Sequence, residues 1–159
     1  MENPVRSNTA VETPRGARFD PASTLLRDIE EATNTLNGCL LELEQVLAQP
    51  SLDAGALTSV RLRLAGIRLT RGPLINRISD FLASNVSQAE QAALDDLRNS
   101  HQRILQAATV HTSKWTLDAI SRDWATYRRE TRTLVSRWRS KSDQDSRLVD
   151  PLIRRAMGG

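Results

Sequence analysis

The first long segment of the chain, residues 25–46, reads LLRDIEEATNTLNGCLLELEQV. Its apolar residues recur at alternating steps of three and four, a spacing that places them on one face of an α-helix. The members of this face are Leu25, Ile29, Ala32, Leu36, Cys39, Leu43 and Val46. A helix with one apolar stripe must bury that stripe against other elements, so this segment predicts a packed helical core.

Three later segments repeat the spacing, and each carries its own seam of inward-facing residues. The second seam consists of Leu57, Val60, Leu64, Ile67, Arg71, Leu74, Ile78 and Phe81, and the third of Leu94, Leu97, His101, Ile104, Ala108, His111 and Trp115. The fourth consists of Leu117, Ile120, Trp124, Tyr127, Thr131, Leu134, Trp138, Lys141, Asp145, Leu148 and Leu152. Four such faces predict an all-α fold, an antiparallel up-and-down four-helix bundle.

Capping residues and prolines indicate where these helices should begin and end. We expect helices from Asp20-Pro21 to before Pro50, from Ser51 or Asp53 to about Leu82, from Ser87 to Val110 or Lys114, and from Thr116–Asp118 to about Ser140. The third start is a capping box, because Ser87 is followed three residues later by Glu90. Gly72-Pro73 should kink the second helix without ending it, since the seam keeps its phase on both sides.

The segment after the fourth helix is less regular. Residues 140–146 are polar and should loosen the helix, and Asp150-Pro151 should open a last turn or short helix. We therefore expect a bundle domain at residues 20–155, preceded by a disordered tail at residues 1–19 that is rich in breakers and has no apolar run.

The composition is typical of one soluble globular domain, with 159 residues, 39% hydrophobic and 26% charged. No apolar run approaches the ~18 residues that a membrane-spanning helix needs, and no secretory signal opens the chain. The single cysteine, Cys39, cannot form an internal disulfide and lies on the first seam. We therefore expect a cytoplasmic protein that does not insert into membranes and in which Cys39 is a buried core residue.

Charge is distributed unevenly along the chain. Residues 1–60 contain four arginines and nine acids, a net charge of −5, whereas residues 61–159 contain eighteen basic residues and ten acids, a net charge of +8. The clearest basic face lies on the fourth helix and includes Arg122, Arg128, Arg129, Arg132 and Arg139. These residues either pair with the acidic first helix or bind a partner, an unknown protein or the phosphates of a nucleic acid. Sequence-specific nucleic-acid binding is not expected, because these arginines alternate along the helix with seam residues that must face the core. Whether the chain forms a homo-oligomer is left open.

Four charged or titratable residues on the seams stand out, namely Arg71, His101, Lys141 and Asp145. Lys141 and Asp145 are spaced i, i+4 and can form an ion pair on one helix face. Two interpretations are open: the group lines an interior that binds a small anionic ligand, or the seam opens to solvent near the C-terminus and these residues only border it. His101 and His111 would be roughly 15 Å apart on one helix, too far to share a metal ion.

Sequence motifs for catalysis are missing from the chain. It contains no G-x-G-x-x-G, no P-loop and no G-x-S-x-G, and no histidine can be matched to a nucleophile and an acid. Only 4% of the residues are aromatic, which disfavours a surface for stacking nucleic-acid bases. We therefore predict no catalytic residues, no metal and no cofactor.

Three segments indicate a known family, namely the run from Trp115 to Thr131, residues 148–152 (LVDPL) and residues 78–82 (ISDFL). Through them, residues 20–155 resemble the hemerythrin-like (HHE) four-helix bundles. The run from Trp115 to Thr131 is similar to the passage between helices three and four in some bacterial members, and residues 148–152 (LVDPL) stand where that family has a Leu-Tyr/Phe-Pro-Leu type sequence. Residues 78–82 (ISDFL) look like a degenerate copy of that motif. The resemblance implies an all-α bundle that carries its iron ligands on four helices.

The metal ligands of that family are replaced in this chain. Counting back from the two motifs places Lys141 and Asp145 on one His and Glu pair, and Thr70 and Leu74 on the other. His101 could match a third ligand. The chain thus resembles a hemerythrin-like protein that has lost its di-iron site and acts as a non-catalytic binding or regulatory module. The alternatives are an oxygen- or iron-binding member, and a histidine phosphotransfer-like bundle, whose His-x-x-Lys is similar to residues 111–114 (HTSK).

Overall fold

A computed structural model describes residues 20–158 of the chain. These residues form the helices α1 (Pro21–Ala48), α2 (Ala54–Leu82), α3 (Gln88–Lys114), α4 (Leu117–Arg122) and α5 (Trp124–Gly158). The prediction of an all-α fold is confirmed, since this part of the chain contains no strand. The predicted tail at residues 1–19 lies outside the described residues.

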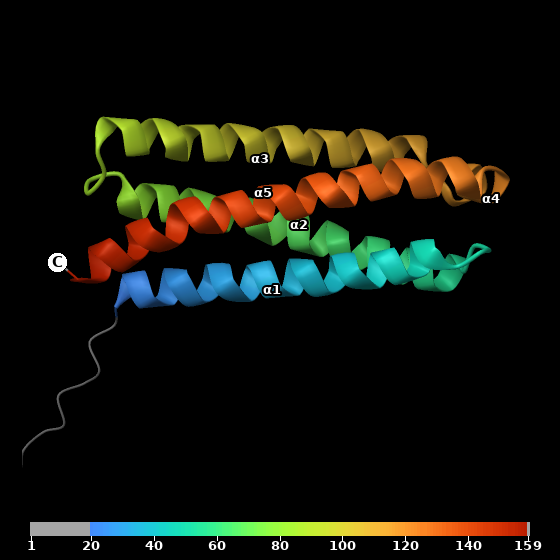
Figure 1. Ribbon diagram of the computed structural model, residues 1–159, viewed down its shortest axis with the longest axis horizontal. Helices are drawn as coiled ribbons and strands as arrows, with labels where there is room; N and C mark the ends of the chain where they lie inside the picture. The colour runs from blue at the N-terminus through green and yellow to red at the C-terminus, as the bar shows by residue number, and fades with distance from the viewer. Residues whose placement is uncertain (1–19, 159) are drawn as a thin grey trace, which may run out of the picture.

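The long helices α1, α2, α3 and α5 lie along one another, and each runs opposite to the long helix before it (Figure 1). α4 is a short helix at the end of the molecule where the chain passes from α3 to α5 (Figure 1). α1 packs extensively against α2 and α5, whereas α3 makes fewer contacts with its neighbours. The described residues thus form five helices where the sequence predicts four.

The predicted helix starts are confirmed by their capping hydrogen bonds. The Asp20 side chain accepts from the backbone N–H of Ala22 at 3.1 Å, and the Asp53 side chain caps α2 in the same way. At α3 the Ser87 hydroxyl accepts from the Glu90 N–H at 3.2 Å, while the Glu90 carboxylate accepts from the Ser87 N–H at 2.8 Å. Each cap satisfies N–H groups that have no partner inside their own helix.

Asp123 divides the segment that the sequence predicts as a single fourth helix. Its backbone is not helical, with φ −144° and ψ 68°, and its carboxylate accepts from the N–H of Thr126 at 3.1 Å. Asp123 therefore caps the start of α5, and Thr116 caps α4 through a hydrogen bond from the N–H of Ala119. The prediction of one helix from Thr116 was wrong because a local side-chain bond at Asp123 competes with helical continuation.

Neither internal proline ends its helix. α2 passes through Pro73, as predicted, and α5 passes through Pro151 to Gly158. The predicted loosening of residues 140–146 and the new turn at Asp150-Pro151 were therefore wrong. The physical reason is tertiary: Ser142 is only 1% exposed and Ile153 is fully buried, so packing holds this region helical despite its polar sequence.

Two apolar clusters form the core, and a group of buried polar residues separates them. The first cluster includes Leu25, Ile29, Leu74, Ile78, Leu94, Val149 and Ile153. The second includes Leu36, Leu43, Leu57, Val60, Ile104, Ile120, Tyr127 and Trp138. Arg71 on α2, His101 on α3, and Lys141, Ser142 and Asp145 on α5 lie between members of the two clusters along their helices. Leu117 departs from the predicted seam, because it is 44% exposed.

Candidate functional site

The four seam residues singled out from the sequence come together in the interior. Arg71 from α2, His101 from α3, and Lys141 and Asp145 from α5 are 1%, 3%, 8% and 3% exposed, respectively. We call these four residues the polar layer. Their burial excludes the interpretation in which they only border the solvent.

Asp145 is the centre of the ion pairs in this layer. Its carboxylate accepts a hydrogen bond from Lys141 Nζ, one helical turn away, and its Oδ2 lies 3.5 Å from Arg71 Nη2 on α2. The same Arg71 nitrogen lies at hydrogen-bond distance, 3.4 Å, from the hydroxyl of Ser142. The carboxylate of Asp145 therefore pairs with two cations, the guanidinium of Arg71 and the ammonium of Lys141, and it links α2 to α5.

His101 lies beside these cations without a hydrogen bond of its own. Burial, together with the positive charges of Arg71 and Lys141, lowers the pKa of His101 from 6.5 to about 4, so the ring is neutral at pH 7. Both ring nitrogens of His101 and Nη1 of Arg71 are buried and have no hydrogen-bond partner among residues 20–158. His101 packs edge-on against Trp138, with ring centroids 6.4 Å apart. The layer thus carries one net positive charge at neutral pH.

The chemistry of the polar layer does not fit the di-iron site that the resemblance implies. A metal of that type needs several carboxylate and imidazole donors that converge on one point. Here the guanidinium of Arg71 and the ammonium of Lys141 lie around a single carboxylate, and burial raises the pKa of Asp145 while the neighbouring cations oppose that rise. Among residues 20–158 no group of three His, Cys, Asp or Glu side chains is placed to hold a metal ion.

Most of the predicted basic face is engaged within the molecule. Arg128 Nε and Arg132 Nη2 donate to the carbonyl of Leu47 at 2.6 and 3.2 Å, and they thereby satisfy the last turn of α1. Arg139 pairs with Glu44 at 2.6 Å and Arg122 with Asp118 at 2.7 Å. Arg129 is exposed and belongs to none of the ion pairs found in residues 20–158.

Acidic residues of α1 find their partners on α2 and α5. Ion pairs link Asp28 to Arg77, Glu30 to Arg154, Glu42 to Arg63 and Glu44 to Arg139. The uneven charge along the sequence is therefore largely compensated between neighbouring helices. Because most of these pairs are exposed, each contributes little to stability, and their main effect is on helix pairing.

An apolar pocket of about 300 Å³ lies beside the polar layer, and it was not predicted from the sequence. It opens between α2 and α3, and its lining includes Leu36, Leu62, Leu64, Ala65, Ala108, Leu117, Tyr127, Leu134, Val135 and Trp138. Leu62 is 73% exposed and so marks the mouth of the pocket. The only sequence signal was the pair Arg61 and Arg68, which are one heptad apart beside the seam residue Leu64.

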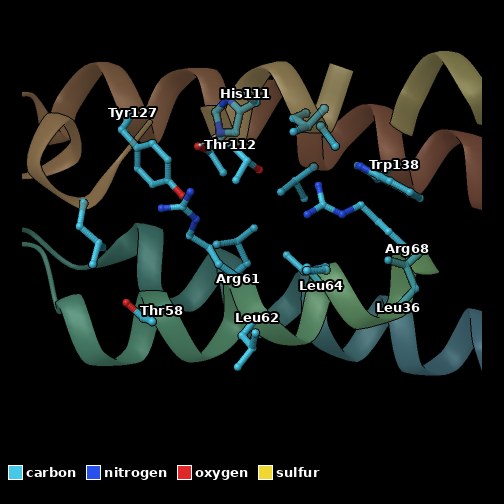
Figure 2. Close-up of a pocket in the computed structure, with 17 residues that line it drawn as sticks. Leu36, Thr58, Arg61, Leu62, Leu64, Arg68, His111, Thr112, Tyr127 and Trp138 are labelled. Atoms are coloured by element: carbon cyan, nitrogen blue, oxygen red, sulfur yellow. Dashed lines mark hydrogen bonds between the residues drawn. The ribbon is translucent and has the colours of Figure 1, made fainter. Parts of the chain in front are cut away.

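Two arginines and a histidine supply the basic groups of this pocket, and three threonines and Tyr127 add hydroxyl groups. Figure 2 shows the guanidinium of Arg68 reaching from α2 into the pocket and that of Arg61 lying beside the Tyr127 hydroxyl. Arg61 Nη2 donates to the carbonyl of Trp115 at 2.9 Å. His111 Nε2 lies 3.0 Å from the Thr131 hydroxyl, and the ring stacks on Tyr127 at 5.6 Å. Burial lowers the pKa of His111, which favours the neutral ring.

Comparisons of the chain with protein-family models, with curated proteins and with solved structures give no match in any of the three. Within residues 20–158, no helix combines the length and the hydropathy that a membrane span requires. The fold and its interior thus define an all-α protein with a charged layer in its core and, next to it, an apolar pocket open to solvent.

Proposed function

We propose that this protein is a non-catalytic binding or regulatory module that takes a small, largely apolar molecule into the pocket between α2 and α3. The observation that carries the proposal is the pocket itself, whose lining is predominantly aliphatic and aromatic and whose volume is about 300 Å³. That volume lies at the small end of the ~300–1,000 Å³ range of small-molecule sites. Such a site buries most of its ligand and uses a few polar groups for orientation.

We further propose that the architecture is a degenerate hemerythrin-like, antiparallel four-helix bundle. Support comes from the opposed directions of the long helices and from the pairing of Lys141 with Asp145, the two residues that would fall on ligand positions of that family when counted back from residues 148–152. In this view an internal ion pair replaces the metal, and the polar layer serves to fix the register of α2 against α5.

The candidate nucleophile and bases support a binding role over catalysis. Cys39 is buried, burial raises the pKa of its thiol, and its Sγ faces the carbonyl of Val60 at 3.8 Å. Among the described residues, His101 has no hydrogen-bond partner, and His111 faces a threonine hydroxyl without a hydrogen-bonded acid to orient it. None of these groups has the hydrogen-bonded base and orienting acid that nucleophilic catalysis uses.

Titration with a neutral apolar fluorophore, N-phenyl-1-naphthylamine, tests the proposal. We expect saturable binding with enhanced probe fluorescence, accompanied by quenching of Trp138, which lines the pocket. The variant Ala65→Phe fills the pocket and should abolish binding. Ala107→Phe is the matched control, because Ala107 is half-buried on α3 but does not line the pocket. Equal probe binding by both variants, or no saturable binding to the native chain, would contradict a ligand site here.

A further inference from the structure

The polar groups of the pocket are all basic or neutral. Its lining, taken over the part of the chain that the structure describes, includes Arg61, Arg68 and His111 but no aspartate or glutamate. The two arginines come from the same face of α2, and Figure 2 shows both side chains directed toward the opposite helices. The pocket is therefore a positively charged site in which apolar walls partly exclude water from the two guanidinium groups.

The other arginines of α2 pair with carboxylates, so the lack of an acidic partner is confined to the arginines of the pocket. Arg63 pairs with Glu42, Arg71 with Asp145, and Arg77 with Asp28. Arg61 uses one nitrogen on the Trp115 carbonyl, and Arg68 has no hydrogen bond or ion pair to any described residue. Every arginine of α2 therefore has an acidic partner except the two that line the pocket.

Arg68 also bears a desolvation cost that its surroundings do not offset. It is half-buried, and burial lowers its pKa, with a further contribution from the charge of Arg61 one heptad away. An anion placed against this guanidinium would restore the lost solvation, and a carboxylate matches its planar fork with two parallel hydrogen bonds.

We infer that the pocket binds an amphipathic carboxylate, with the carboxylate on the guanidinium of Arg68 and the apolar body against Leu64, Leu134 and Trp138. Arg61 adds positive charge at the same mouth but remains anchored to the Trp115 carbonyl. This inference rests on the proposed function, because it assigns the ligand class of the same pocket. The small cavity favours a medium-length chain or a single aromatic ring over a long-chain lipid.

The test compares octanoate with octanol, which has the same chain without the charge, by calorimetric titration of the full-length protein. We expect octanoate to bind about ten-fold more tightly than octanol, since a hydrogen bond to a charged group adds roughly that factor. The difference should shrink at high salt, because an ionic contact at a solvent-open pocket is screened. Octyl phosphate should bind no more tightly than octanoate.

Two arginine variants test whether the guanidinium of Arg68 contacts the carboxylate of octanoate. Arg68→Gln should reduce octanoate affinity about ten-fold and leave octanol affinity unchanged. Arg63→Gln is the matched control, because Arg63 lies on the same helix, outside the pocket, and pairs with Glu42. Circular dichroism would verify that both variants are folded, and the comparison of ligands in the native protein does not depend on either variant.

The outcomes separate the two proposals. Equal affinities for octanoate and octanol, or equal effects of the two variants, would overturn the carboxylate assignment while the apolar pocket remained a ligand site. A marked preference for octyl phosphate would also overturn it. If neither octanoate nor octanol binds and the neutral fluorophore also fails, the pocket is not a ligand site and the proposed function itself is refuted.

Discussion

Removal of Asp145 should destabilise the protein far more than removal of Lys141, although the two residues form one ion pair. The polar layer contains two cations and one carboxylate, and that carboxylate contacts both Lys141 and Arg71. Lys141→Met leaves a balanced pair between Arg71 and Asp145. Asp145→Leu leaves two buried cations without a counter-ion, one of them only 1% exposed.

The magnitudes follow from this asymmetry. Breaking a buried ion pair by removing one partner costs about 3–5 kcal/mol, and we expect Asp145→Leu to fall in that range. We expect Lys141→Met to cost about 1 kcal/mol, because the remaining pair is still compensated. In the double variant, the loss of Lys141 removes one of the two cations that Asp145→Leu leaves uncompensated. The double variant should therefore lose less free energy of unfolding than the sum of the two single variants, by about 1–3 kcal/mol.

Equilibrium urea unfolding followed by circular dichroism measures these differences. Asp143→Leu is the control, because Asp143 is exposed on the same helix, and its cost should lie within about 0.5 kcal/mol of zero. A cost for Asp145→Leu no larger than that of Lys141→Met, together with additivity in the double variant, would refute the view that Asp145 compensates a charged core.

Three further predictions concern pH, helix propensity and metal content. His101 has a folded pKa of about 4 against 6.5 in the unfolded chain, so its stabilising contribution is full above pH 6.5 and is lost as the pH falls toward 4. About 2 kcal/mol of stability should be lost between pH 7 and pH 5, and urea unfolding at both pH values should show a smaller loss in His101→Gln. Gly38→Ala and Gly66→Ala should each raise stability by about 0.5–1 kcal/mol in the same assay, because both glycines lie inside helices and an added Cβ would meet no atom within 4 Å; a loss of stability at either site would contradict this reasoning. Elemental analysis of protein expressed in iron-rich medium should find no stoichiometric iron, and about two irons per chain would sink the idea that the polar layer replaces a metal site.

Local sequence signals were sufficient for the starts of α1, α2 and α3. Asp20, Asp53 and Ser87 are short polar residues placed just before periodic segments, and each caps its helix through its side chain. Caps of this kind act within a few residues, so the sequence contains the whole interaction. The break at Asp123 depends on the same kind of bond, but there a continuing apolar period masked it.

The polar layer could be predicted only in part. Seam spacing placed Arg71, His101, Lys141 and Asp145 on inward faces, and their burial agrees with that spacing. The spacing did not reveal that Asp145 would contact Arg71 on α2 as well as Lys141 on its own helix. That contact depends on the relative height of α2 and α5, which periodicity does not determine.

The sequence by itself determined the all-α class, most helix ends and the inward position of the charged residues, because these depend on caps and on a period of 3.6 residues. Only the tertiary structure decided that α5 would continue through its polar segment and Pro151, since burial of Ser142 and Ile153 outweighs weak local propensity. It alone also created the apolar pocket, because a cavity arises from how far apart neighbouring helices pack. No single helix encodes the separation between α2 and α3 that leaves Arg68 beside an open apolar space.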